Sequence, residues 1–205
     1  MDGPALLTFA LASLLVELTP GPNMAWLAIV AVTEGRNQGL SAVAGVALGL
    51  AIIGVLAALG LGTAVAASPT LYEGLRWAGI LWLLWLAYDG WRSAEDAMEE
   101  VPAGWGLERY FRRGLVTNLL NPKAAIFYIA VLPGFTTLAA PILPQVLTLT
   151  LVFVVVATSV HAAIVLLADR ARVFLTRPEQ VRVVRRVLSV ALALVAVWFW
   201  WETAR

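Results

Sequence analysis

The chain has 205 residues, of which 61% are hydrophobic and only 13% are charged, and its mean hydropathy is +0.86. A soluble domain carries about twice that share of charge, so the composition predicts an integral membrane protein. The formal net charge of +1 disfavours nucleic acid as a partner. The absence of cysteine and the single histidine exclude disulfides and disfavour a transition-metal site, and we expect no cofactor.

Six apolar segments follow one another along the chain, and each is long enough for a transmembrane helix. They lie near residues 4–32, 40–67, 71–91, 111–133, 146–168 and 184–201. The first segment lacks a basic n-region and continues past a proline break, so we expect a mature helix rather than a signal peptide. We therefore predict an all-α integral membrane protein with six transmembrane helices, in a single transporter domain over residues 1–205.

The distribution of lysine and arginine predicts how the six spans are oriented. Eleven of the 14 basic residues fall on the side of the membrane opposite the N-terminus, two fall on the N-terminal side, and Lys123 lies inside the fourth span. Cytoplasmic loops carry the excess of basic residues. Both termini are therefore expected to be external, with the polar connector of residues 92–110 in the cytoplasm.

Two proline motifs interrupt apolar segments, one in the first span of each half. The first is Thr19-Pro20-Gly21-Pro22-Asn23 and the second is Asn121-Pro122-Lys123, shortly after Asn118. Proline removes a backbone donor and clashes with the preceding turn. With three spans in each half, the second half crosses in the opposite direction. We predict two inverted three-helix repeats, about 4–91 and 111–201, each with its first helix broken at proline.

The residues beside each proline predict the start of a new half-helix. Thr19 precedes Pro20, and Asn121 precedes Pro122, which is the pattern of an N-cap before a proline at the first helical position. Helix N-termini attract anions, and Lys123 adds a full positive charge, so a carboxylate fits between the two breaks. The predicted substrate-binding residues are Thr19, Pro20, Gly21, Pro22, Asn23, Asn118, Asn121, Pro122 and Lys123. The alternative is a pair of purely structural kinks.

Three further features lie within the spans. Glu17 is a candidate proton carrier, and the alternatives are an ion pair with Lys123 or local packing beside a water-filled vestibule. His161 is the second candidate for proton coupling, and the alternative is a neutral hydrogen bond between helices. Gly45 and Gly49 form a GxxxG match, which predicts close helix packing within one chain or in a homodimer.

These motifs, in this order, resemble the LysE/RhtB family of amino-acid exporters. The resemblance covers about residues 5–180 and is carried by Leu18–Asn23, by Gly35, Gly39, Gly45 and Gly49, by Phe111–Gly114, by Asn118 and Asn121–Ala124, and by Leu132–Phe135. It implies a small carrier in the bacterial cytoplasmic membrane that exports amino acids or close derivatives, with protons as the coupling ion. Glu17 and His161 depart from the family's pattern.

Other classes of protein fit the sequence less well. The chain contains no HExxH motif and no nucleophile–base pair, so we do not expect an enzyme. A small structural subunit of a larger membrane complex does not need two polar helix breaks. That role, and export of a different small solute or ion, are the alternatives to amino-acid export.

Overall fold

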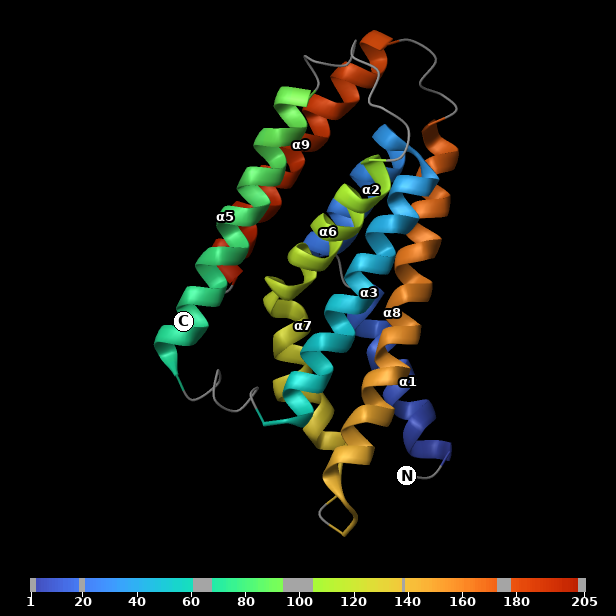
Figure 1. Ribbon diagram of the computed structural model, residues 1–205, viewed down its shortest axis with the longest axis vertical. Helices are drawn as coiled ribbons and strands as arrows, with labels where there is room; N and C mark the ends of the chain where they lie inside the picture. The colour runs from blue at the N-terminus through green and yellow to red at the C-terminus, as the bar shows by residue number, and fades with distance from the viewer. Residues whose placement is uncertain are drawn as a thin grey trace.

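The computed structural model describes residues 3–18, 21–60, 68–93, 105–137, 139–172 and 178–202. All regular structure in these ranges is helical, as predicted (Figure 1). The elements are α1 (Gly3–Leu18), α2 (Pro22–Glu34), α3 (Arg36–Ala58), α5 (Pro69–Ser93), α6 (Trp105–Leu119), α7 (Pro122–Ile126), the π-helix η1 (Phe127–Val131), the 3₁₀-helix η2 (Leu132–Phe135), α8 (Ile142–Arg172) and α9 (Pro178–Glu202).

The described residues contain between two and four candidate membrane spans, judged by length and composition. The helices α3 and α8 qualify singly. The pair α1–α2, bent by 64°, and the pair from α6 to η2, bent by 50°, each qualify as one broken span. The prediction of six spans is therefore met only in part. The two predicted spans outside this set are α5 and α9, which are 25 residues each and carry charged residues in their sequences.

Most helices extend past the apolar segments that predicted them. The helix α8 covers Ile142–Arg172, where the apolar segment covers 146–168, and α9 covers Pro178–Glu202, where it covers 184–201. Hydropathy marks the part of a helix that lies in hydrocarbon, whereas backbone hydrogen bonds continue the helix into polar turns at either end.

A single residue, Gly35, joins α2 to α3. Its φ of 101° lies in the left-handed region, where glycine has no steric penalty. Its N–H donates to the carbonyls of Val30 and Ala31 at the end of α2. The first amide of α3, that of Arg36, donates to Asp169 Oδ1 of α8 over 2.9 Å. The α2–α3 corner is thereby tied to the end of α8.

Small residues bring α3 and α6 into close contact. A Cβ at Gly45 would collide with the carbonyl oxygen of Phe111, and a Cβ at Gly49 would lie 2.9 Å from Asn118 Nδ2. From the other helix, Gly114 approaches the carbonyl of Ala42. The GxxxG match therefore packs within one chain, and a homodimer stays a prediction. The same contact places the Asn118 side chain directly against Gly49 of α3.

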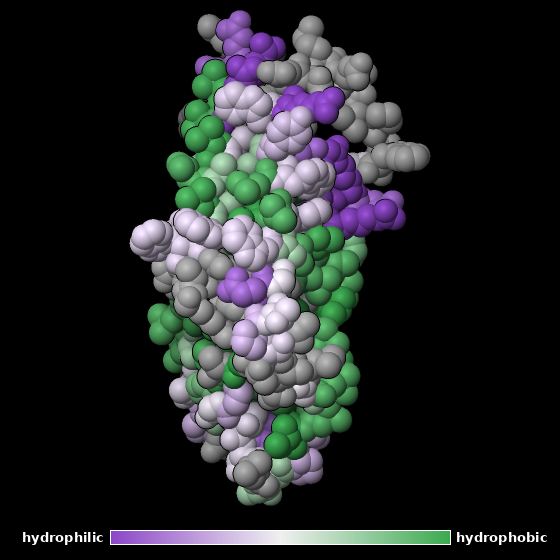
Figure 2. All heavy atoms as spheres, turned by 90° about the vertical axis from the view of Figure 1, so that its left-hand side faces the viewer, coloured by the Kyte–Doolittle hydropathy of each residue, from purple (hydrophilic) through white to green (hydrophobic). Residues whose placement is uncertain are grey.

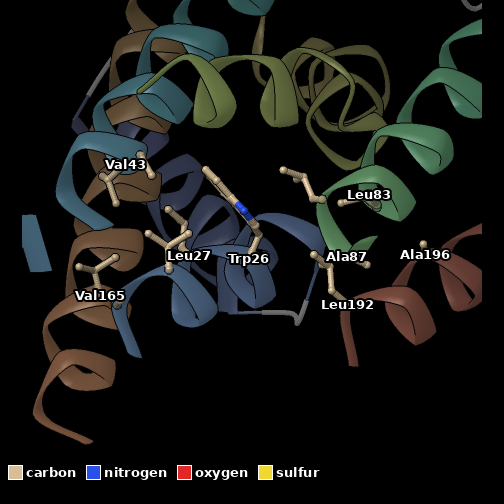
Figure 3. Packing of buried hydrophobic residues seen from close by; sticks show 12 residues of the cluster. Trp26, Leu27, Val43, Leu83, Ala87, Val165, Leu192 and Ala196 are labelled. Carbon is tan, nitrogen blue, oxygen red and sulfur yellow. The ribbon is translucent and has the colours of Figure 1, made fainter. Parts of the chain in front are cut away.

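Two clusters of buried apolar side chains hold the helices together. In the first, which we call the tryptophan cluster, the Trp26 indole lies between residues of α3 and α8 on one side and residues of α5 and α9 on the other (Figure 3). Its members are Trp26, Leu27, Val30, Ala31, Ala42, Val43, Leu83, Leu86, Ala87, Val165, Leu192 and Ala196. This cluster joins the paired helices α5 and α9 to the rest of the molecule.

The second cluster, which we call the aromatic cluster, lies among α1, α3, α7–η2 and α8. The rings of Phe127 and Phe153 stack with centroids 4.0 Å apart, and Phe9 packs against Phe127 at 5.6 Å. Its members are Phe9, Val46, Leu50, Ala124, Phe127, Tyr128, Leu132, Val146, Leu149, Phe153 and Ala157.

The two ends of the molecule differ in which helix ends they hold. The α2–α3 corner, the end of α5, the start of α6, the end of α8 and the start of α9 lie toward the upper end of Figure 1. The start of α1, the end of α3 and the starts of α5 and α8 lie toward the lower end. Figure 2 shows strongly hydrophilic side chains mainly toward the upper end, with hydrophobic ones mainly along the two sides of the face below them.

Candidate functional site

The second helix break begins with the cap that the sequence predicts. Asn121 Oδ1 accepts a hydrogen bond from the backbone N–H of Lys123 over 3.0 Å, and Pro122 is the first residue of α7. The side chain therefore satisfies one of the amides that a helix start leaves unpaired. The α-helical geometry lasts only five residues before it changes to the π-helix η1. Single π-helical turns are frequent at functional sites.

The first break begins two residues later than predicted. The N-cap of α2 is Gly21, with extended backbone at φ −162° and ψ 174°, and Pro22 is the first helical residue. The prediction of a Thr19 cap before Pro20 as the helix start is wrong. The residue before a proline is disfavoured in the α region, so Pro22 keeps Gly21 extended and delays the helix. Thr19 and Pro20 lie outside the described residues.

The two half-helix starts therefore correspond as Pro22 and Pro122, and the alignment of Pro20 with Pro122 is shifted by two residues. In both cases the preceding half-helix contributes its penultimate residue to the same place. These residues are Glu17, before the end of α1 at Leu18, and Asn118, before the end of α6 at Leu119. Both side chains are buried.

A hydrogen bond between amide side chains joins the two breaks. Asn23 Nδ2, in the first turn of α2, donates to Asn118 Oδ1 over 2.8 Å. Both side chains are buried, with 5% and 0% of their surface exposed. Within the part of the chain that the structure describes, Asn23 Oδ1 and Asn118 Nδ2 have no hydrogen-bond partner. One buried acceptor and one buried donor of this pair thus lack a partner, which costs about 1–3 kcal/mol each.

The residues around this bond enclose one small cavity. It is lined by Glu17, Gly21, Asn23, Met24, Leu50, Asn118, Asn121, Lys123, Ala124 and His161. These side chains come from both breaks and from α1, α3 and α8. The cavity has a free volume of about 10 Å³ for a water-sized sphere, which is room for about one water molecule.

Glu17 and His161 form an ion pair or hydrogen bond at the edge of this cavity. His161 Nε2 lies 3.2 Å from Glu17 Oε2, with 2% and 8% of the two side chains exposed. The sequence suggested Lys123 as a partner for Glu17. Lys123 lines the same cavity, and the contact that the structure shows for Glu17 is with His161. The ring's other nitrogen, Nδ1, has no hydrogen-bond partner among the described residues.

Three apolar residues complete the lining and were not predicted from the sequence. Met24 follows the first break, Ala124 follows Lys123, and Leu50 faces the cavity from α3. The carbonyl of Leu50 accepts a hydrogen bond from Tyr128 Oη over 3.0 Å. Leu50 and Ala124 also belong to the aromatic cluster, which therefore bounds the cavity on that side. Leu50 is one of many leucines in apolar segments, and nothing in its sequence context singles it out.

The described residues contain no group of three or more His, Cys, Asp or Glu that could hold a metal ion. The charged groups that line the cavity are one carboxylate, one ammonium group and one imidazole. This set, together with three amides, suits the binding of a small polar or zwitterionic solute by ion pairs and hydrogen bonds.

Buried polar groups at two interrupted helices, inside an all-helical fold with a largely apolar exterior, define a membrane transport protein. Residues 14–203 match the family described as LysE type translocator. The chain belongs to this family, which confirms the resemblance, and it is a multi-pass membrane transport protein rather than an enzyme.

Curated relatives have printed names that specify transport. A homoserine/homoserine lactone efflux protein of Salmonella typhimurium is 30% identical over 188 residues, which cover 91% of each chain. A leucine efflux protein of Salmonella choleraesuis is 32% identical over 138 residues, covering 65% of this chain and 64% of that protein. A leucine efflux protein of Klebsiella pneumoniae is 31% identical over 130 residues, covering 60% and 59%. No solved structure matches the chain.

Proposed function

We propose that this protein exports amino acids or close derivatives across the bacterial cytoplasmic membrane, by proton antiport with alternating access. The observation that carries this proposal is the Asn23–Asn118 hydrogen bond, which joins the two helix breaks around a cavity that Lys123 also lines. The relatives named for homoserine and leucine efflux support an amino acid as the substrate.

The substrate's carboxylate is expected to bind at Lys123 and at the start of α2. The helix α2 has 13 residues, long enough for its first amides to attract an anion. The helix α7 has five residues of α geometry, so in the second break the attraction comes mainly from the charge of Lys123. Asn118 Nδ2 is a further donor in reach of the same cavity. The proposed binding set is completed by Thr19, Pro20, Gly21, Pro22, Asn23, Asn121 and Pro122.

The coupling ion is proposed to be the proton, with Glu17 and His161 as its carriers. Ionisable groups inside a membrane protein are costly and mark ion or proton pathways. Both side chains are nine-tenths or more buried and in contact with each other beside the substrate cavity. A proton bound here would be coupled electrostatically to whatever the cavity holds.

Six spans, arranged as two inverted repeats within a single domain of residues 1–205, are the topology we propose. At 25 residues each, α5 and α9 are about 37 Å long, which exceeds the hydrocarbon thickness of about 30 Å. Exchanging the repeats maps the packed pair α3–α6 onto α8–α1 and leaves α3–α8 and α5–α9 as pairs, and all of these pairs are in contact. The repeats, about 4–91 and 111–201, are joined by the connector 92–110.

The cytoplasmic side is assigned to the end that holds the α2–α3 corner, because the arginine-rich loops attach there. Both termini are then external. The cavity has room for about one water molecule, so an amino acid enters only after helices move apart. Rocking of one repeat against the other would open the cavity to each side in turn.

Solute counterflow in proteoliposomes tests this function. The purified protein is reconstituted, vesicles are loaded with an unlabelled amino acid, and uptake of the labelled compound is followed for homoserine, threonine, leucine, lysine and glutamate. We expect counterflow for at least one amino acid, and accumulation driven by a pH gradient in the direction of antiport.

A matched control is the variant Ser159→Ala. Ser159 is exposed on α8, two residues from His161, and its hydroxyl donates to the Val155 carbonyl of its own helix. This variant should behave as the wild type. Absence of counterflow for every amino acid tested would refute amino-acid export and favour a structural subunit or a carrier of another solute.

A further inference from the structure

We infer that Glu17 binds the ammonium group of the substrate, and that protonated His161 competes with this ammonium for the Glu17 carboxylate. The inference rests on the proposed function, because it assumes that an amino acid occupies the cavity. Glu17 thereby takes part in substrate binding as well as in coupling. Substrate and proton exclude each other because the ammonium and the imidazolium compete for the same carboxylate.

Glu17 is the single carboxylate that lines the cavity in the described part of the chain. It projects from the penultimate position of α1, where the first break opens. A buried carboxylate needs a hydrogen-bonded counter-charge. The cavity offers Glu17 two cationic groups of the protein, Lys123 and, when protonated, His161. The ion-pair geometry that the structure shows for Glu17 is with His161. A substrate ammonium is a third cation that can bind there.

The opposite charges of the cavity match the two charges of an amino acid. Of the residues that line the cavity, Lys123 and Asn118 carry donors that suit a carboxylate, whereas Glu17 and Asn23 carry acceptors that suit an ammonium group. Met24, Leu50 and Ala124 provide an apolar wall for a side chain. Among the described residues that line the cavity, no second carboxylate is present to pair with a cationic side chain.

Charge balance explains why substrate and proton exclude each other. With neutral His161, the carboxylate and Lys123 cancel, and a zwitterion adds no net charge. With protonated His161, one Glu17 carboxylate would have to balance three cations, namely the substrate ammonium, the imidazolium and Lys123. In a buried site, where charges are weakly screened, this arrangement is unfavourable. Tyr128 on η1 is a further titratable group near the cavity among the described residues, and its hydroxyl donates to the Leu50 carbonyl, which belongs to a lining residue.

In this inference His161 releases its proton on the cytoplasmic side and takes up a proton on the external side. When the ammonium binds Glu17 from the cytoplasmic side, an N–H bond of the His161 imidazolium breaks, its electron pair stays on nitrogen, and the proton goes to cytoplasmic water. When the amino acid has left on the outside, the neutral ring takes a proton from external water. His161 Nδ1, which has no partner among the described residues, is the nitrogen available for this exchange while Nε2 faces Glu17.

The test compares homoserine and leucine with their 2-hydroxy acids, which keep the carboxylate and side chain but lack the ammonium. Each compound is measured as an inhibitor of counterflow at several pH values. In the wild type we expect the amino acid to bind about tenfold or more tightly than the hydroxy acid. Amino-acid binding should weaken as pH falls, because imidazolium then occupies Glu17, while hydroxy-acid binding should not weaken.

Variants assign these effects to residues. Glu17→Gln should remove the preference for the amino acid, and Glu17→Asp should restore part of it. His161→Gln should remove the weakening at low pH, whereas the neighbouring Ser159→Ala should retain it. Equal binding of amino and hydroxy acids by the wild type, or the same loss at low pH in His161→Gln, would overturn the inference. Either result leaves counterflow intact, whereas failure of the proposed function would abolish counterflow in the wild type.

Discussion

Asn121 connects the backbone of the second break to its binding groups. Its Oδ1 accepts from the Lys123 amide, so the same side chain starts α7 and fixes the backbone that carries the lysine. Replacement of a capping asparagine by alanine costs about 1 kcal/mol of stability. We expect Asn121→Ala to lower the thermal unfolding midpoint in detergent by about 2–4 °C. Asn121→Ser, which keeps an N-cap acceptor, should lie close to the wild type, and an equal loss in both variants would contradict the capping role.

Lys123 is predicted to bind the substrate through its charge. We expect Lys123→Ala to raise the half-saturation concentration for counterflow about tenfold or more, because a charge-assisted bond to the carboxylate is lost. Lys123→Arg keeps the charge and should retain part of the affinity. Since the 2-hydroxy acid carries the same carboxylate, its binding should weaken in Lys123→Ala as well. Unchanged affinity for both compounds would show that Lys123 does not contact the substrate.

The sequence predicts the local geometry of the candidate site well where the signal lies in neighbouring residues, and poorly where it does not. Asn121 and Lys123 are adjacent to a proline, and the cap they form depends on three consecutive residues. The start of α2 was misplaced because two prolines compete, and the order of Gly21 and Pro22 decides between them. The contact of Glu17 with His161 joins residues far apart in the chain. No local pattern could have chosen His161 over Lys123 as the group in contact with Glu17.

At the scale of secondary-structure elements, the close contact of α3 with α6 limits side-chain size at Gly45. A methyl group there would collide with the backbone carbonyl of Phe111, which cannot rotate away as a side chain can. Overpacking of this kind costs about 1–3 kcal/mol. We therefore expect Gly45→Ala to lower the thermal unfolding midpoint and, by displacing α6, to weaken substrate binding through Asn118.

The control for this prediction is Gly74→Ala in α5. Gly74 is exposed and a Cβ there would meet nothing within 4 Å. Alanine should stabilise this helix by about 0.5–1 kcal/mol, since glycine is the poorer helix former. If Gly45→Ala left the thermal unfolding midpoint as high as Gly74→Ala does, the α3–α6 contact would be looser than the geometry indicates.

The elements themselves were predicted in type and order, but not in their inner geometry. Each of the six apolar segments contains a helix, and both breaks fall where proline interrupts an apolar run. The change from α7 to the π-helix η1 and the 3₁₀-helix η2 was not predicted. Residues 127–131 include no glycine or proline to signal it, and the aromatic packing of Phe127 against Phe153 is a tertiary contact. The single-residue corner at Gly35 was marked only as a glycine that fits the family.

At the scale of the whole molecule, the site lies where the two halves of the chain meet. The amides of Asn23 and Asn118 come from different halves of the chain, and Glu17 and His161 do as well. Each half thus contributes one member of each polar pair. The proposed rocking of one half against the other would stretch or break both contacts, so in this proposal substrate binding and proton binding are sensitive to the same motion.

The final prediction concerns the orientation of the whole molecule in the membrane. The wild-type chain has no cysteine, so single cysteines can be introduced directly at exposed positions: Asn37 and Leu107 near one end, Thr70 and Ala140 near the other. In intact cells treated with an impermeant thiol reagent, we expect labelling of Thr70→Cys and Ala140→Cys, and protection of Asn37→Cys and Leu107→Cys until the cells are permeabilised. The physical reason is the excess of arginine beside the protected positions, which disfavours their translocation.

The reverse labelling pattern would show the opposite orientation of the same six spans. Labelling of Thr70→Cys and Leu107→Cys from the same side would show that α5 does not cross the membrane, and would leave the two halves without the opposite orientations that an inverted repeat requires.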